Sequence, residues 1–510
     1  MALAKYFSKD VLAITQVLNK GGVDIFSSLL NVHVIEIAFD TDVLFQEGKA
    51  SIDLLIKLAS RLYPKLKFTS LNNLTDRYVK QFENLAKNIN NKIDIVTEPS
   101  TIIIVIGKTS VVSSSVNTPI FYVGSNNWMV YFSNTQPVGS GDSLMPFAAG
   151  AAACIAAANI FRYVFNSLIE AVEYDSDICL SLISLEENDT NPKLTISDIG
   201  DVVVVGLGAV GNGVLWSLSN LATITGKISF IDHEFVSLSN LQRYVECEEL
   251  DEGKLKVELA NEKLAHGRFV TEGFAMTWKD YIAKHKDFEN SMVLCGVDSA
   301  KGRIGIQSSL PKQILNGFTE QGLLGVSRHI NFLDNACIGC MYIPTENKKS
   351  KSQEVAENLG IPHLEKDLVR PYLYYDFLVD ENILKQISLY NNINQDELKR
   401  FIGIPMSKFY SDFVCGGILL TLKQKEDSTA KIETPLAFQS AFAGILLVSE
   451  LFLIRGGIRD GNFKNVTHFY PLLPIQNGIN PYNHTLSKNK GNNCFCLDKL
   501  FVEAYKGKYL

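Results

Sequence analysis

The hydrophobic pattern of the first 190 residues indicates strands that alternate with helices. Apolar runs rich in β-branched and aromatic residues predict strands at 31–40, 101–110 and 120–133. The helical spacing of apolar positions predicts a helix at 51–64, and the N-terminal stretch 1–20 is typical of an amphipathic helix. Strands that alternate with helices favour a mainly parallel α/β sheet.

The same pattern begins again after a polar stretch at 188–197, where we expect a domain boundary. Strand, helix, strand and a later strand are predicted at 201–208, 209–222, 226–234 and 291–299. Residues 345–400 are polar and charged, which is typical of an insertion between structural elements.

Two helical stretches rich in small residues look alike, at 146–162 and 435–455. Each begins with proline and ends with an aromatic residue and an arginine. They are either unrelated core helices or the same helix of a duplicated domain. If the domain is duplicated, the first copy has lost its nucleotide site, because Lys108 stands where a second loop glycine is needed.

Composition and charge narrow the class of protein. The 510 residues are 46% hydrophobic and 20% charged, which is ordinary for a soluble globular protein. A net charge of −7 without a basic run argues against binding to nucleic acid. Lys5, Lys9 and Asp10 interrupt the N-terminal stretch, so it lacks the core of a signal peptide. We expect a cytoplasmic protein with mostly reduced cysteines and no membrane partner.

Three glycines follow a strand of four valines in the spacing G-x-G-x-x-G: Gly206, Gly208 and Gly211. Glycine permits a tight turn and a close approach to phosphate, and the following helix offers free N–H groups. Asp232 ends the next predicted strand, where it can bind both hydroxyls of a ribose. The pattern predicts an adenine-nucleotide site for either NAD or ATP. The alternative is a glycine turn needed only for packing.

An ordered set of polar residues further along the chain favours ATP. When AMP is transferred to a carboxylate, Arg243 and Lys256 can neutralise the charge that develops on the phosphates, and Asn240 can orient a phosphate oxygen. Asp298 can hold Mg²⁺, which bridges phosphates. Hydride transfer to or from NAD does not need this set. Each residue taken alone is equally well explained as a surface or strand-end polar group.

The segments GLGAVGNGV, ISFIDHEFVSLSNLQRY, GKLKVELA and GVDSAKGR together closely resemble the ThiF/HesA/MoeB superfamily, which includes the ubiquitin-activating enzymes. The resemblance covers 201–303 closely and the rest of the C-terminal half more loosely. It implies an ATP-dependent adenylyltransferase that acts on the C-terminal carboxylate of a ubiquitin-like protein. The roles given above then belong to Asp232, Asn240, Arg243, Lys256 and Asp298. Tyr244 departs from the family, which often has glutamine there, and we expect little effect.

Two cysteine pairs, Cys337 with Cys340 and Cys494 with Cys496, can supply four thiolates to a structural zinc ion. Members of the family often carry paired C-x-x-C motifs in similar places, which supports zinc. The second pair departs from that pattern because its spacing is C-x-C. The alternative is two reduced pairs in loops.

Cys415 lies twenty residues before Pro435, where the second small-residue helix begins. A thiolate is a good nucleophile toward an acyl adenylate, and the N–H groups of Gly416 and Gly417 would lower the pKa of this thiol. Members of the family that form thioesters place their cysteine in or near this region. We therefore expect a thioester on Cys415, and the alternative is a core cysteine. Cys247 is a weaker candidate, because neighbouring carboxylates would raise its pKa.

We expect two Rossmann-like, adenylation-type domains with mainly parallel sheets, the first of them degenerate. Residues 1–195 form the inactive domain, and residues 196–510 form the active ThiF-type domain with a catalytic-cysteine and crossover region at about 345–435. Paired domains of this family complete each other's site, and Arg77 and Arg162 are candidates for that contribution. The pairing resembles the activating enzymes of bacterial antiphage ubiquitin-like conjugation systems of the Bil type.

The predicted function is ATP-dependent adenylation of a ubiquitin-like protein, thioester formation on the enzyme and transfer to a conjugating enzyme, by a monomer or homodimer. One alternative is an adenylyltransferase that activates a peptide or carrier-protein carboxylate for sulfur transfer or amide formation without a thioester. The others are an NAD-dependent oxidoreductase and a scaffold that binds nucleotide without turnover.

Overall fold

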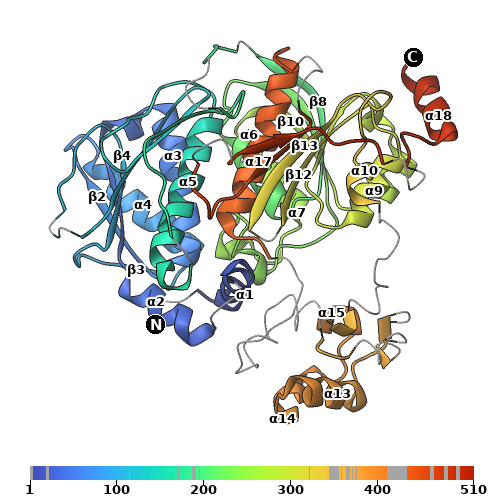
Figure 1. Cartoon of the computed structure of the whole chain (residues 1–510), viewed down its shortest axis with the longest axis horizontal. Coiled ribbons are helices and arrows are strands. Elements are labelled where there is room, and N and C mark those ends of the chain that lie inside the picture. Colours follow the sequence, from blue (N-terminus) through green and yellow to red (C-terminus); the bar gives the residue numbers. More distant parts are fainter. Residues whose placement is uncertain are drawn as a thin grey trace. The chain divides into compact units, whose positions relative to one another are not determined.

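The computed structural model describes residues 4–18, 22–113, 115, 117–169, 172–186, 191–194, 196–320, 322–343, 355–357, 359–362, 368–369, 372–373, 376–410, 434–459, 464–475, 480–489 and 494–510. The chain divides into two compact units. The larger unit comprises 1–5, 30–343 and 437–510, and the smaller unit comprises 6–29 and 344–436 (Figure 1).

The first sheet of the larger unit has the strand order β3-β2-β1-β4-β5-β6-β7. Its strands are β1 (Ile35–Phe39), β2 (Lys65–Ser70), β3 (Asp94–Ile95), β4 (Ile102–Ile106), β5 (Ile120–Asn126), β6 (Met129–Ser133) and β7 (Ile178–Ser181). The first five pair in parallel, and β6 and β7 are antiparallel. The predicted strand at 120–133 is a hairpin that turns at Asn127, whose φ is +58°.

The second sheet has the order β10-β9-β8-β11-β12-β13-β14-β15. Its strands are β8 (Asp198–Val205), β9 (Thr225–Ile231), β10 (Arg268–Phe274), β11 (Met292–Cys295), β12 (Gln313–Glu320), β13 (Leu323–His329), β14 (Val466–Phe469) and β15 (Tyr482–His484). Strands β8 to β12 pair in parallel, and the last three are antiparallel.

The two sheets share one topology. In each, the first strand in sequence lies between the second and the fourth, and the fifth leads into antiparallel strands. Helix α5 (Phe147–Val164) comes between β6 and β7, and α17 (Ala437–Arg455) comes between β13 and β14. These are the two similar stretches of the sequence, so the common topology supports a duplicated domain. The predicted α/β class with two Rossmann-like, mainly parallel sheets is confirmed.

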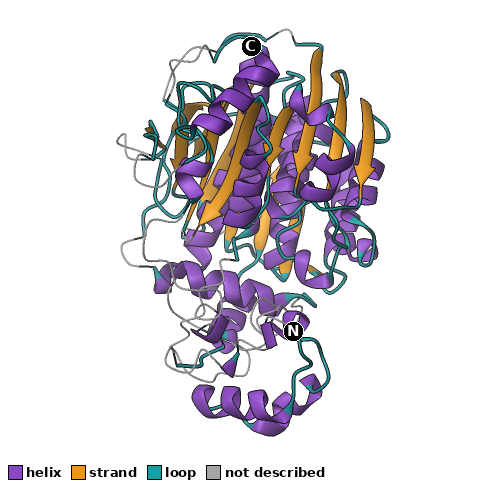
Figure 2. Ribbon diagram, turned by 90° about the vertical axis from the view of Figure 1, so that its right-hand side faces the viewer, coloured by secondary structure: helices purple, strands orange, loops and turns teal. Residues whose placement is uncertain are grey.

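Helices of the larger unit lie alongside its strands (Figure 2). They are α3 (Gln46–Leu62), α4 (Asp76–Ile89), α6 (Ala209–Ser219), α7 (Lys256–Leu264), α8 (Trp278–Lys284), α9 (Ala300–Ser308), α10 (Gly339–Tyr342) and α18 (Lys499–Tyr509), besides α5 and α17. Small residues allow three of them to meet closely. A Cβ on Gly150 of α5 would lie 2.4 Å from Trp216 of α6, and one on Gly444 of α17 would lie 2.4 Å from the Val210 carbonyl of α6.

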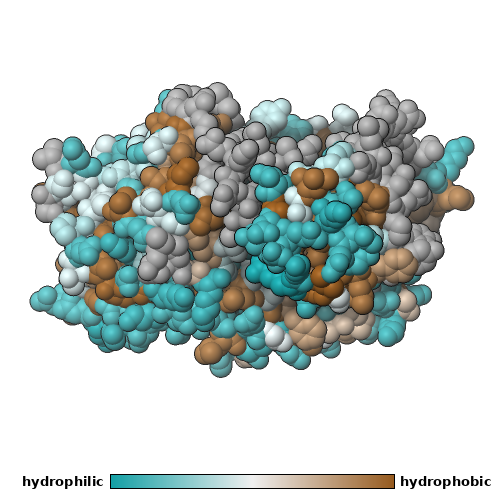
Figure 3. Space-filling model, turned by 90° about the horizontal axis from the view of Figure 1, so that it is seen from below, coloured by the Kyte–Doolittle hydropathy of each residue, from teal (hydrophilic) through white to brown (hydrophobic). Residues whose placement is uncertain are grey.

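Helices α5 and α17 are long and apolar enough to cross a membrane, but 94% of each apolar window is buried inside the protein. They are therefore core helices, as the alanine-rich composition of α5 predicts. The described residues on the face seen in Figure 3 are a mixture of hydrophilic and hydrophobic ones, as is ordinary for a protein surface.

The described part of the smaller unit is helical. It contains α1 (Phe7–Leu18), most of α2 (Val23–Val32), α13 (Glu381–Asn391), α14 (Gln395–Leu398) and α15 (Met406–Tyr410). The segment predicted as a polar insertion contributes to a hydrophobic core, in which Ile383, Leu384 and Ile387 are fully or almost fully buried. Its apolar residues are spaced at helical intervals between charged ones, so average polarity concealed a folded element.

Candidate functional site

The glycine loop connects β8 to α6 with the geometry that a phosphate-binding turn requires. Gly206 has a φ of +88°, which favours glycine, and Gly208 is the N-cap of α6. A Cβ on Gly211 would lie 2.3 Å from the Gly206 carbonyl oxygen, so this position accepts only glycine. The loop therefore presents the N-terminus of α6 at the carboxyl end of the sheet, where an anion is stabilised.

Asp232 follows β9 and borders the glycine loop. Its Oδ2 accepts a hydrogen bond from the Leu207 N–H at 2.7 Å, and its Oδ1 accepts one from the Glu234 N–H at 2.9 Å. The carboxylate is thus fixed beside the loop, at the place where the sequence predicts a ribose-binding group.

Two cations converge on Tyr244. The Lys256 Nζ lies 5.3 Å from the centroid of the Tyr244 ring, and the Arg243 Cζ lies 5.6 Å from it. A Cβ on Gly208 would lie 3.6 Å from the Tyr244 hydroxyl, so the ring reaches the glycine loop. Tyr244 therefore lies within the site.

Lys256 is buried at the start of α7 and is charged. Its Nζ donates to Glu234 Oε2 at 2.5 Å, and the Lys256 side chain is only 4% exposed. Burial alone would lower the pKa of Lys256, but Tyr244, Asp232 and Glu234 outweigh it and hold the pKa above its ordinary value. The site therefore keeps a fixed positive charge at neutral pH.

Arg243 has an unused donor. Its Nη1 is buried and has no hydrogen-bond partner within the described part of the chain. A buried guanidinium N–H without an acceptor costs free energy, which an anionic ligand would recover. This donor lies beside Tyr244 at the edge of the glycine loop.

Asn240 follows β9 and Asp298 follows β11, the two strands that neighbour β8 in the sheet. Asn240 ends a short 3₁₀ turn (Leu238–Asn240), and its Oδ1 accepts from the Ser237 N–H at 3.0 Å, which leaves the amide nitrogen as a donor. Asp298 is exposed in the loop after β11. The neighbouring Val297 N lies 2.9 Å from the position of a Cβ on Gly206, so the two loops meet.

The equivalent strand ends in the first sheet are filled by carboxylates. Asp40 follows β1, as Gly206 follows β8, and its Oδ2 accepts from the N–H groups of Lys108 and Thr109 at 2.8 and 2.9 Å. Glu47 Oε1 accepts from the N–H groups of Asn127 and Ser143 at 2.9 and 3.0 Å. Backbone donors that could bind a phosphate are therefore engaged by the protein's own carboxylates in this copy.

The four predicted metal ligands form one cluster. Cys340 Sγ lies 3.9 Å from Cys337 Sγ, 3.3 Å from Cys494 Sγ and 3.5 Å from Cys496 Sγ, and all four sulfurs lie within 4.8 Å of one another. Zinc–sulfur bonds of about 2.3 Å in a tetrahedron give sulfur separations of about 3.8 Å. The cluster can hold a zinc ion.

The predicted nucleophile, Cys415, lies outside the described residues. Burial raises the pKa of Cys154 and Cys295, and it raises the pKa of Cys247 to about 12. These three thiols are therefore poor nucleophiles, as the sequence predicts for Cys247.

Neither arginine considered for the contribution of the N-terminal half reaches the glycine loop through a described contact. The Arg162 guanidinium pairs with Asp175 in the core, and Arg77 is exposed beside the Tyr78 ring.

Asn212 is a site residue that sequence reasoning missed. Its Nδ2 donates to the carbonyls of Leu207 and Gly208 at 3.2 and 3.1 Å, and its Oδ1 accepts from the Glu246 N–H at 3.1 Å. The asparagine directly after Gly211 was a usable signal, because an amide next to a phosphate loop can bind the loop's own backbone.

Two protein families match parts of this chain. Residues 174–491 match the ThiF family, and residues 38–166 match Prokaryotic E2 family C. The uncharacterized protein y4jF of Sinorhizobium fredii is 34% identical over 517 residues, which cover 100% of this chain and 98% of that protein.

Solved structures with a detectable likeness include E. coli MccB with MccA-N7isoAsn, at 15% identity over 58% of this chain and 67% of that chain, with a TM-score of 0.34. E. coli MccB with ATP is 15% identical over 58% of this chain and 66% of that chain, with a TM-score of 0.33. The ThiF match covers more than half of the sequence and includes every predicted nucleotide-site residue. The chain therefore belongs to the ThiF family and is an enzyme of the adenylyltransferase type.

Proposed function

We propose that this enzyme uses ATP and Mg²⁺ to adenylate the C-terminal carboxylate of a ubiquitin-like protein. The observation that carries the proposal is the buried Arg243 Nη1, which has no acceptor within the described part of the chain. Lys256 adds a second cation beside the same ring. Two cations beside a glycine loop match the charge of a triphosphate better than the smaller charge of the pyrophosphate in NAD.

In the first step, a carboxylate oxygen of the substrate attacks the α-phosphorus of ATP, and the bond from that phosphorus to pyrophosphate breaks. Arg243 and Lys256 stabilise the charge that develops on the phosphate oxygens, and Asn240 orients one of them through its amide nitrogen. Asp232 binds the ribose. Asp298 would hold Mg²⁺, which would neutralise part of the charge on the phosphates.

In the second step, the thiolate of Cys415 attacks the acyl carbon, AMP leaves, and a thioester forms for transfer to a conjugating enzyme. The chain has nine cysteines. Four form the metal-type cluster, and three are buried with raised pKa values. Cys415 is thus favoured over these seven on chemical grounds.

One further observation supports a role in ubiquitin-like conjugation. The N-terminal half matches a family named for E2 proteins. The only cysteine within 38–166, Cys154, is buried and is a poor nucleophile. That half therefore fits a non-catalytic partner domain, as proposed for residues 1–195, with 196–510 as the active domain. We place the enzyme in the cytoplasm, in a conjugation system of the antiphage Bil type, as a monomer or homodimer.

Thermal-shift measurements on the full chain test the nucleotide. ATP with Mg²⁺ should stabilise the wild type, by about 2.7 kcal/mol at a hundredfold excess over Kd, whereas NAD should not. Lys256→Ala should remove most of the shift, and Lys263→Ala, in the last turn of the same helix, should keep it. A shift with NAD alone would identify an oxidoreductase and refute the proposal.

The thioester needs its own experiment. Wild type, Cys415→Ala and Lys256→Ala are incubated with a candidate ubiquitin-like protein and ATP·Mg²⁺. A covalent adduct released by thiol reductant should form with the wild type only, while Cys415→Ala should still consume ATP to pyrophosphate. Adenylation by the wild type without any reducible adduct would favour carboxylate activation for sulfur transfer or amide formation instead.

A further inference from the structure

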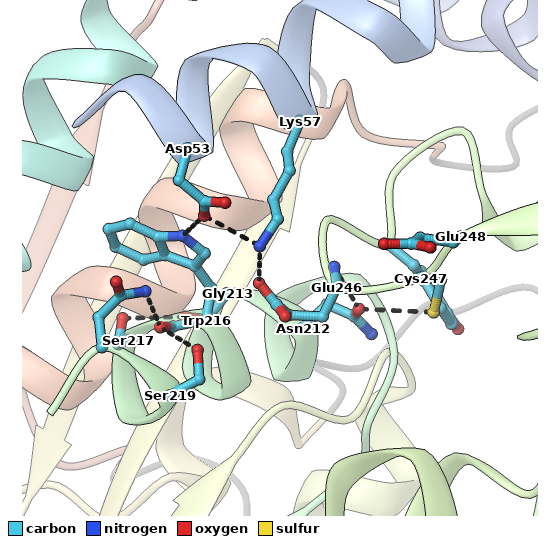
Figure 4. Close-up of polar contacts among 12 residues, drawn as sticks. Asp53, Lys57, Asn212, Gly213, Trp216, Ser217, Ser219, Glu246, Cys247 and Glu248 are labelled. Carbon is cyan, nitrogen blue, oxygen red and sulfur yellow. Dashed lines mark hydrogen bonds and ion pairs between the residues drawn. The ribbon is translucent and has the colours of Figure 1, made fainter. Parts of the chain in front are cut away.

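One face of α3, in the N-terminal half, contacts the active half at three successive turns. Asp53, Lys57 and Arg61 are spaced four residues apart, so they share that face. Figure 4 shows Asp53 and Lys57 pointing at residues of the active half. Asp53 Oδ2 accepts from the Trp216 Nε1–H at 2.9 Å, and Lys57 Nζ donates to Glu246 Oε1 at 2.7 Å.

Arg61 binds backbone rather than side chains on the active half. Its Nη2 donates to the carbonyl oxygens of Tyr244 and Cys247 at 2.6 and 2.7 Å. A planar guanidinium that holds two carbonyls fixes the path of the chain between them. Tyr244 is the residue whose ring lies between Arg243, Lys256 and the glycine loop.

Asn212 continues these contacts to the loop itself. Its Oδ1 accepts from the Glu246 N–H at 3.1 Å (Figure 4). Its Nδ2 donates to the Gly208 carbonyl at 3.1 Å. The Leu207 N–H then donates to Asp232 at 2.7 Å. A continuous series of hydrogen bonds therefore runs from α3 to the ribose-binding carboxylate.

The side chains that make these contacts are buried, so breaking the contacts costs free energy. The side chains of Lys57 and Glu246 are 14% and 3% exposed, and Arg61 is 1% exposed. Burial alone would lower the pKa of Lys57, but Asp53 and Glu246 outweigh it and raise the pKa. Removing one partner of such a pair leaves a buried charge without its counter-ion.

We propose that Lys57 and Arg61 are positioning residues for the nucleotide site of the other half. They hold segment 244–247, and through Asn212 they hold the glycine loop in the shape that receives phosphate. This inference rests on the proposed function, because the ligand is ATP·Mg²⁺. It gives the degenerate half a mechanical role that needs no contact with the nucleotide.

The test is calorimetric titration of the full chain with ATP·Mg²⁺. Lys57→Met and Arg61→Gln should each weaken binding about tenfold or more, and Lys57→Arg should restore it because it keeps the charge beside Glu246. Lys49→Met, at an exposed position of the same helix, is the matched control and should bind like the wild type. Unfolding of the unliganded variants is followed in parallel.

A double-mutant cycle between Lys57 and Asn212 distinguishes a positioning effect on ATP binding from a general loss of stability. If α3 acts through Asn212, Lys57→Met should weaken ATP binding much less in an Asn212→Ala background than in the wild type. Additive effects, or folded Lys57→Met protein that binds ATP like the wild type, would overturn the inference while leaving the proposed function intact. If the Arg61→Gln variant does not fold, the comparison of Lys57→Met with Lys57→Arg still tests the inference. Wild type that does not bind ATP at all refutes the proposed function itself.

Discussion

At the scale of single residues, the shape of the glycine loop depends on the absence of a side chain at Gly211. A Cβ on Gly211 would lie 2.3 Å from the Gly206 carbonyl oxygen, closer than real atoms come. Backbone would have to move to relieve that contact, and the moving backbone is the loop that receives phosphate.

We therefore expect Gly211→Ala to weaken ATP·Mg²⁺ binding more than tenfold, about 1.4 kcal/mol or more. Gly305→Ala is the control, because nothing lies within 4 Å of its Cβ position in α9 and alanine favours a helix. Titration calorimetry on both variants measures the difference. Equal affinities would show that the loop tolerates a side chain.

For Arg243, we expect a substitution to have opposite effects on two quantities: the stability of the unliganded protein and its stabilisation by ATP·Mg²⁺. Arg243→Met removes a buried donor that has no acceptor among the described residues, so the unliganded protein should be as stable as the wild type or more stable. The same variant should lose most of the stabilisation by ATP·Mg²⁺. Thermal unfolding with and without nucleotide gives both quantities, and a destabilised variant that keeps its ATP shift would contradict the role of Arg243.

Sequence reasoning could reach the residues that carry a local signal. Gly206, Gly208 and Gly211 follow a valine strand, and Asp232 ends the next one, so periodicity and spacing were enough to place them together. Lys57 and Glu246 lie 189 residues apart, and no local pattern pairs them. Their contact arises from packing of α3 against the other half, which one sequence does not encode in any short motif.

At the scale of an element, α17 is held near its end by a buried ion network. Glu450 Oε1 accepts from Arg328 of β13 at 2.5 Å and from Arg459 at 2.7 Å. Burial alone would raise the pKa of Glu450, but the two arginines outweigh it and lower the pKa to about 2. The network ties the core helix to the antiparallel edge of the second sheet.

Acid should therefore weaken this element in a defined window. A carboxyl group whose pKa is lowered by folding stabilises the protein above its ordinary pKa of 4.5, and that contribution is lost as the pH falls toward 2. Glu450→Gln should cost about 3–5 kcal/mol at neutral pH, because it leaves two buried guanidinium groups without a counter-charge. Urea unfolding at several pH values checks both, and the variant should show a weaker dependence on pH between 4.5 and 2.

The hydrophobic pattern predicted whether a segment forms a strand or a helix better than it predicted the first and last residues of that element. The apolar run at 291–299 forms a strand only at Met292–Cys295, because the loop that carries Asp298 begins directly after it. The charged segment after residue 345 contains buried Ile383 and Ile387, which average polarity hides and helical spacing reveals.

At the scale of the whole molecule, the cysteine cluster joins segments 157 residues apart, from Cys337 to Cys494. Helix α18 follows the second pair, and its Tyr505 hydroxyl donates to the Lys312 carbonyl at 3.0 Å. Bound zinc would fasten the end of the chain to the second sheet.

Removal of metal by a chelator, or Cys494→Ser, should therefore release the segment 494–510 before it affects the glycine loop. Hydrogen exchange checks this: protection should fall in α18 and persist in α6. Cys179→Ser, which lies outside the cluster, is the control. Unchanged protection of α18 after complete metal removal would show that the cluster does not fasten it.

The carboxylates that fill the strand ends of the first sheet have a consequence for stoichiometry. Because Asp40 and Glu47 engage the backbone donors of that copy, we expect it to bind no nucleotide, and a titration with ATP should saturate at one nucleotide per chain. The supporting half is covalently attached, so its effective concentration at the site does not fall on dilution. Specific activity should then be independent of enzyme concentration, unlike that of an enzyme whose site is completed by a dissociable second subunit.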